Sequence, residues 1–129
     1  MDGGLATLLE NKYGCDLNHK LWSSLILESQ PELVYNAHKD FAISGADIMI
    51  CCTYQSSLEG FDNDYRVFEK SIENAVKVAK DAVRDSEIET GRKAFVAGSC
   101  GTYGASIPGG TEYTGDYLQE LSDQEKVDF

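Results

Sequence analysis

The chain has 129 residues, of which 42% are hydrophobic and two are proline, a composition typical of a domain with one packed core. Its formal net charge of −11 would repel the phosphates of nucleic acids and the anionic surface of a membrane. No apolar run approaches the roughly 18 residues that cross a bilayer, and Met1-Asp2-Gly3-Gly4 lacks the features of a signal peptide, which predicts a cytoplasmic protein without nucleic-acid or membrane partners.

The first clear elements are a helix and the strand that follows it. Residues 31–44 carry apolar side chains at the spacing of one helical face, at Leu33, Val34, Ala37 and Phe41. Pro31 suits the first turn of this helix and Gly45 its end. Residues 46–54 are almost all apolar, which predicts a strand that is buried on both faces and ends near Thr53.

A second helix and a second strand follow in the same order. Apolar residues recur every three or four positions, at Phe68, Ile72, Ala75, Val76, Ala79, Ala82 and Val83. Residues 93–98 are again short, apolar and bounded by glycine, which predicts another buried strand. Alternating helices and buried strands indicate an α/β fold with a parallel sheet, either open or closed as a barrel.

In both arrangements the functional loops follow the carboxyl ends of the strands, which here are residues 53–61 and 99–117. The tail from Tyr117 to Phe129 is polar, and Ser122 suits the cap of a further helix. Two strands cannot close a parallel barrel. The chain therefore pairs with another chain, forms a smaller sheet, or is an incomplete copy of a larger domain.

Two segments offer candidate ligand-binding residues. Asp2 stands beside Gly3 and Gly4, so that a carboxylate and closely approachable backbone could hold an ammonium group, although a turn or cap before a helix from Leu5 explains the same residues and is favoured. Trp22 is the only tryptophan and could lie over a cationic methyl donor. Packing against the next helix explains Trp22 equally well.

The cysteines and histidines do not form a recognisable metal site. Cys51 and Cys52 are neighbours on the first predicted strand, so their side chains should point to opposite faces, and burial as small apolar residues is the favoured interpretation. All four cysteines are expected to be reduced thiols. His19 and His38 lack partner ligands at metal-binding spacing and are interpreted as structural. The glycine-rich residues 98–104 lack the lysine of a P-loop, so phosphate binding is not favoured.

The opening residues Asp2-Gly3-Gly4-Leu5-Ala6-Thr7-Leu8-Leu9-Glu10 resemble the signature of homocysteine S-methyltransferases. Further segments resemble that family in the same order, and together they cover nearly the whole chain. They are Leu21-Trp22-Ser23, Pro31-Glu32-Leu33, His38-Lys39-Asp40-Phe41, Gly45-Ala46-Asp47, Thr53-Tyr54-Gln55-Ser56-Ser57, Val96-Ala97-Gly98-Ser99 and Glu112-Tyr113-Thr114-Gly115-Asp116-Tyr117.

The resemblance implies a (β/α)8 TIM barrel that transfers a methyl group to the sulfur of homocysteine, with zinc held by three cysteine thiolates. Asp2 would bind the homocysteine amino group, Gly3 would let the substrate approach the backbone, and Trp22 would face the methyl donor. Thr53 and Gln55 would line the pocket. Residues 112–117 are most similar to the branch that uses S-methylmethionine or S-adenosylmethionine, whereas betaine-using relatives carry an aromatic residue where this chain has Gln55.

Two departures from the family pattern shape the expectations for this chain. The family's first strand normally precedes Asp2, and its zinc-binding cysteines lie on later strands. Residues 1–129 are therefore expected to be the N-terminal part of one homocysteine-binding barrel, with unpaired sheet edges, no zinc site and no activity alone. The alternatives are a betaine-using enzyme, a non-catalytic half-barrel interaction module, or an enzyme of another barrel class.

Overall fold

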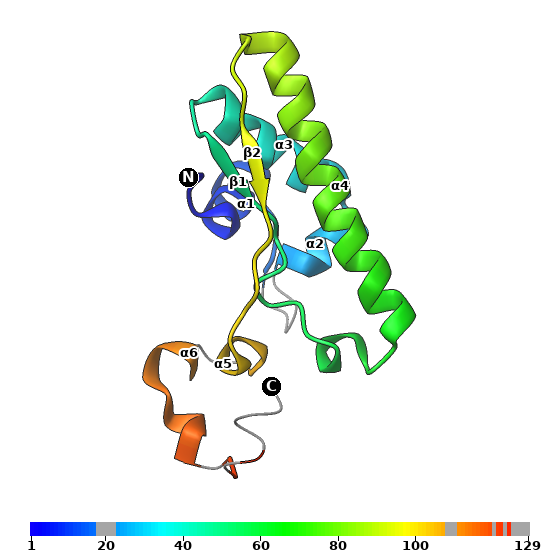
Figure 1. The fold of residues 1–129 in the computed structure, drawn as a ribbon, viewed down its shortest axis with the longest axis vertical. Helices are drawn as coiled ribbons and strands as arrows, with labels where there is room; N and C mark the ends of the chain where they lie inside the picture. Colours follow the sequence, from blue (N-terminus) through cyan, green and yellow to red (C-terminus); the bar gives the residue numbers. More distant parts are fainter. Residues whose placement is uncertain (18–22, 108–110, 120, 123, 125–129) are drawn as a thin grey trace.

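Helices and strands alternate around a small parallel sheet in the computed structural model, which describes residues 1–17, 23–107, 111–119, 121, 122 and 124 (Figure 1). The α-helices are α1 (Leu5–Tyr13), α2 (Ser23–Ser29), α3 (Pro31–Ile43), α4 (Tyr65–Thr90), α5 (Tyr103–Ser106) and α6 (Thr111–Thr114). The strands are β1 (Ile48–Ile50) and β2 (Phe95–Ala97), and the 3-10 helices are η1 (Glu59–Phe61) and η2 (Asp116–Gln119). None of the helices in the described ranges is long and apolar enough to span a membrane.

The sheet is parallel, as the sequence predicts. β1 and β2 pair in the register Ile48–Phe95, Met49–Val96 and Ile50–Ala97. The crossover between them is α4, which packs lengthwise against α3 and covers the sheet (Figure 1). This helix–strand–helix–strand order confirms the predicted α/β class.

The two long helices begin and end where local chemistry favours it. Pro31 occupies the first turn of α3, and Gly45 follows the helix with φ of 104°, as expected of a stop. The second helix is longer than the apolar pattern predicts. It extends back to Tyr65 because the Asp64 side chain accepts hydrogen bonds from the first-turn amides, and it ends at Gly91 in the left-handed conformation.

The strands differ from the prediction in length and burial. β1 ends at Ile50 rather than near Thr53, and the chain bends at Cys52. Met49 is fully buried, but Phe95 on β2 is 70% exposed, so the prediction that both faces of the second strand are buried is wrong. Phe95 is exposed because no described element packs over its side of the sheet.

The outer edge of β1 is occupied, contrary to the expected unpaired edge. The Asp2 amide donates to the carbonyl oxygen of Ile48 at 2.8 Å, and the Asp2 carboxylate accepts from the amide of Ile50 at 2.8 Å. In a parallel ladder the second bond would go to a backbone carbonyl. Asp2 therefore takes the place of a neighbouring strand although residues 1–4 form no strand of their own.

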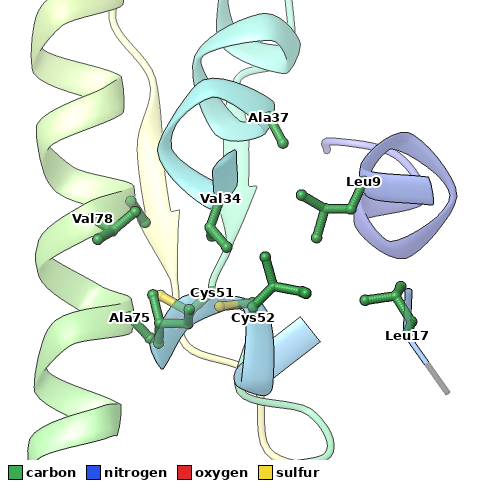
Figure 2. Close-up of a cluster of buried hydrophobic side chains, with 11 residues drawn as sticks. Leu9, Leu17, Val34, Ala37, Cys51, Cys52, Ala75 and Val78 are labelled. Carbon is green, nitrogen blue, oxygen red and sulfur yellow. The ribbon is translucent and has the colours of Figure 1, made fainter. Parts of the chain in front are cut away.

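The main apolar core lies between α1, α2, α3, α4 and the end of β1 (Figure 2). Its fully or almost fully buried members are Leu9, Leu17, Ile26, Leu27, Val34, Ala37, Cys51, Cys52, Ala75, Val78 and Ala79. A second, smaller cluster of Ala42, Met49 and Val83 joins α3 and α4 to the sheet. Val96 of β2 packs against both clusters, so each strand is joined to the helices on this face of the sheet.

Beyond β2 the chain forms short helices instead of the loop expected over residues 99–117 (Figure 1). A β-carbon at Gly104 would lie 2.8 Å from Cα of Glu112, so α5 and α6 approach each other as closely as glycine allows. The rings of Tyr103 and Tyr117 contact each other at an angle of 43°, with centroids 5.5 Å apart. The helix predicted after Ser122 falls largely outside the described residues.

Candidate functional site at the carboxyl end of β1

A cleft of about 190 Å³ opens where β1 ends. It is lined by residues of the N-terminal segment, α1, the end of β1 and the loops after both strands: Asp2, Gly3, Leu5, Ala6, Ile50, Cys51, Cys52, Tyr54, Gln55 and Ser99. Three of the five predicted binding residues, Asp2, Gly3 and Gln55, meet there. The carboxyl ends of parallel strands are where α/β folds place their ligands.

A larger hollow of about 710 Å³ runs along one flank of α4. The described residues that line it all lie on this one helix: Ile72, Glu73, Val76, Lys77, Lys80, Asp81 and Arg84. Binding sites are usually concave and formed by several elements with converging polar groups. The smaller cleft at the strand ends is therefore the better candidate.

Asp2 is fixed at the mouth of the cleft by its hydrogen bonds to β1. Its Oδ2 atom accepts from the Ile50 amide, whereas Oδ1 makes no hydrogen bond among the described residues. The side chain is half-buried. A held carboxylate with one open oxygen is suited to accept a charged hydrogen bond from an ammonium group.

Gly3 lines the cleft next to Asp2 and also packs against α3. A β-carbon at this position would lie 3.0 Å from Cε1 of Phe41, which is tighter than ordinary contact. Close packing therefore explains Gly3 as well as substrate approach does, and α1 begins at Leu5 as the capping interpretation predicts.

Thr53 does not line the cleft. It is buried, and its Oγ1 donates to the carbonyl oxygen of Ser99 at 2.6 Å, which ties the loop after β1 to the loop after β2. The amide of Ser56 donates to the carbonyl of Thr53, so residues 53–56 form a turn. Thr53 anchors that turn, and Tyr54 and Gln55 are the residues of the turn that line the cleft.

The other end of the turn is held by α2. The Ser24 hydroxyl is fully buried, donates to the carbonyl of Cys52 at 2.9 Å and lies 2.7 Å from the Ser56 hydroxyl. A β-carbon at Gly101 would collide with the carbonyl oxygen of Tyr54. The glycine-rich loop after β2 therefore approaches the backbone of this turn closely at Gly101. Sequence reasoning missed Ser24 because its partners lie 28 and 32 residues away.

Cys51 and Cys52 belong to the apolar core, as the sequence interpretation favours (Figure 2). Both lie in one cluster rather than on opposite faces, because the strand ends before them. Burial raises the pKa of Cys51, and it raises the pKa of Cys52 to about 12. Both thiols are therefore protonated at neutral pH and are poor metal ligands or nucleophiles.

The described residues do not fit a catalytic zinc site. Within the described ranges, no three His, Cys, Asp or Glu side chains are grouped closely enough to hold a metal ion. Zinc requires at least three converging protein ligands in the deprotonated form. Trp22 and His19 lie outside the described residues, so the predicted contact of Trp22 with a methyl donor is not located.

Comparisons with known proteins extend over the whole chain. The sequence model described as homocysteine S-methyltransferase matches residues 1–129. The chain is 40% identical to homocysteine S-methyltransferase YbgG of Bacillus subtilis (strain 168), over all of this chain and 42% of that protein. It is 36% identical to selenocysteine Se-methyltransferase of Brassica oleracea var. italica, over all of this chain and 41% of that protein.

Solved structures agree with the sequence matches. The crystal structure of the homocysteine methyltransferase MmuM from Escherichia coli, in its metallated form, superposes with a TM-score of 0.83 at 37% identity. The match covers 91% of this chain and 42% of that one. The chain thus spans less than half the length of the relatives that it matches.

Proposed function

From the membership of this chain in the homocysteine S-methyltransferase family, we infer that it forms the homocysteine-binding side of such an enzyme. The observation that carries the proposal is the cleft at the end of β1, where Asp2, Gly3 and Gln55 meet. Residues 1–129 are then the N-terminal part of one (β/α)8 barrel, and the superposition on 42% of a solved relative supports this.

Asp2 is proposed to bind the amino group of homocysteine. Its Oδ2 is used by the Ile50 amide, and Oδ1 is left to accept from the ammonium. The bond to β1 fixes the carboxylate before the ligand arrives, so little side-chain entropy is lost on binding. The amide side chain of Gln55, held by the turn of residues 53–56, offers a polar contact on the opposite loop.

The proposed reaction is methyl transfer from a sulfonium donor, S-methylmethionine or S-adenosylmethionine. The homocysteine thiolate donates an electron pair to the methyl carbon, and the donor C–S bond breaks with its electrons remaining on the donor sulfur. Homocysteine becomes methionine, the donor becomes a neutral thioether, and the thiol proton is released. A polar Gln55 in place of an aromatic residue supports a sulfonium donor over betaine.

Zinc, which would stabilise the thiolate, is proposed to be held by strands that follow residues 1–129 in the relatives. The cysteines in the described part of this chain are buried or isolated, so the chain alone is expected to hold no catalytic zinc and to transfer no methyl group. Zinc stoichiometry and methyl transfer from each donor test this expectation. One tightly held zinc per chain together with turnover would contradict the expected inactivity. Turnover with betaine but with neither sulfonium compound would contradict the choice of donor.

The binding proposal is tested with homocysteine and the 129-residue chain, by isothermal titration calorimetry and by amide chemical shifts. Asp2→Asn keeps an oxygen for the Ile50 amide but removes the charge, and it should weaken homocysteine binding about ten- to a hundred-fold. Glu32→Gln removes the same charge at an exposed position of α3 and should leave affinity unchanged. Equal affinities for all three proteins would remove Asp2 from the site.

A further inference from the structure

The imidazole of His38 is a buried polar group without a hydrogen-bond partner. It lies on α3, it is 0% exposed, and neither Nδ1 nor Nε2 makes a hydrogen bond in the described structure. Leaving a buried donor unsatisfied costs about 1–3 kcal/mol, so apolar side chains are normally preferred at such positions. A buried histidine without a partner needs an explanation, and one explanation is a hydrogen bond that forms only when a ligand is bound.

His38 lies on the side of α3 that faces the N-terminal segment. Phe41 follows it by one helical turn on the same face, and the Phe41 ring packs directly on Gly3. Asp2 precedes Gly3 in the chain, and its negative charge acts on the imidazole of His38 in the direction that raises the His38 pKa. Because His38 and Phe41 share a face of α3 and Phe41 packs on Gly3, the Asp2 carboxylate beside Gly3 is a candidate acceptor for the unsatisfied His38 N–H.

The imidazole is neutral at physiological pH. Burial lowers the pKa of His38, and the negative charge of Asp2 opposes that effect without overcoming it. A neutral imidazole carries one N–H donor and does not cancel the charge of a carboxylate that it contacts. An imidazolium would instead compete with the ligand for Asp2.

We propose that His38 is a positioning residue for Asp2 in homocysteine binding. When the ammonium of homocysteine engages Oδ1, the neutral imidazole donates a hydrogen bond to the carboxylate from the α3 side, while the Ile50 amide holds Oδ2 from the β1 side. Hydrogen bonds at functional sites are often unmade in the free protein and form only in the complex. The inference rests on the proposed homocysteine site.

The test compares homocysteine with its analogue that lacks the amino group, on the 129-residue chain. His38→Phe keeps the volume and removes the donor, and it should weaken homocysteine binding about three- to tenfold while leaving the analogue unchanged. His38→Gln, which keeps an N–H donor, should restore part of the affinity. In an Asp2→Asn background, His38→Phe should have no further effect, because the two residues act as one unit.

A purely structural role for His38 predicts a different outcome, in which both ligands weaken equally, and that result would overturn the proposal. If no variant and no unmodified chain binds homocysteine, the proposed function fails instead. The proximity of the two residues in the ligand-free chain is tested separately by nitrogen NMR of the His38 ring. Asp2→Asn should lower the His38 pKa further, and an unchanged pKa would show that Asp2 does not act on His38 and would overturn the proposed pairing.

Discussion

The two strands of the sheet have similar apolar sequences but very different surroundings. β1 has Asp2 on its outer edge, α3 and α4 packed against it, and Met49 fully buried. β2 also packs against α4, but among the described residues it pairs only with β1, and Phe95 is 70% exposed. An apolar strand sequence therefore does not itself ensure burial, because burial depends on which elements cover the strand.

The end of β1 and the outer edge of β2 also differ in how well they are suited to bind a ligand. The cleft lies at the end of the strand with the occupied edge, where the backbone is fixed by Asp2, Ser24 and Thr53. Binding groups on a fixed scaffold lose little freedom when a ligand arrives. The outer edge of β2, in contrast, is a surface on which a further strand could add.

The largest expected contrast in stability is between a buried residue of β1 and an exposed residue of β2. Met49→Ala should lower the free energy of unfolding by about 2–5 kcal/mol because it opens a cavity in a packed region. Phe95→Ala, on the paired strand, should change it by about 0.5 kcal/mol or less because the ring is already in water. Urea denaturation measures both, and similar losses would show that β2 is covered in solution.

Ser24 is expected to matter more than another serine of the same helix. Ser24→Ala removes the buried hydroxyl that serves Cys52 and Ser56 and should cost about 1–3 kcal/mol. Ser29→Ala is the matched control, because the Ser29 hydroxyl is exposed and bonds only within α2. If Ser29→Ala lowers the free energy of unfolding as much as Ser24→Ala does, the Ser24 hydroxyl does not stabilise the turn of residues 53–56.

The occupied edge of β1 is tested by two substitutions of one residue. Asp2→Ala removes the acceptor for the Ile50 amide and should lower the free energy of unfolding by about 0.5–1.5 kcal/mol. Asp2→Asn keeps an oxygen acceptor and should lose little stability. The same loss in both variants would mean that charge, rather than the edge hydrogen bond, stabilises the native state.

The pH dependence of the free energy of unfolding should report the burial of His38 on α3. Because burial lowers its pKa below the ordinary 6.5, the unfolded chain binds a proton at pH values where the native chain does not. Its stabilising contribution is present above pH 6.5 and is lost as pH falls through the folded-state pKa. His38→Phe should remove this part of the slope, measured by urea denaturation at several pH values, and an unchanged slope would show that His38 is solvated.

The smallest effect on stability is expected at the open edge of β2, where solubility should respond instead. Phe95→Lys places a charge beside the unpaired strand and should reduce self-association while leaving the urea midpoint nearly unchanged. Light scattering over a range of concentrations measures the association. Tyr65→Lys, which replaces another exposed aromatic residue at the start of α4, is the control and should have a smaller effect.

The sequence predicted the helices α3 and α4 and the parallel order of the strands, because the spacing of apolar residues and the flanking Pro31 and Gly45 of α3 act locally. The end of β1 was placed too late, since an apolar run does not distinguish paired residues from buried loop residues such as Cys52. Asp2, Gly3 and Gln55 were grouped through a family resemblance, and the structure places them in one cleft. Their roles in binding stay predictions.

By itself the sequence determined the two long helices, where the first of them begins and ends, and to which family the chain belongs. Only the tertiary structure decided that Asp2 takes the place of a neighbouring strand, that Thr53 bonds Ser99 rather than a ligand, and that Ser24 holds the turn of residues 53–56. These contacts join residues 28 to 48 positions apart. Local periodicity reports which face of an element is apolar, whereas a hydrogen bond between distant segments depends on how whole elements pack.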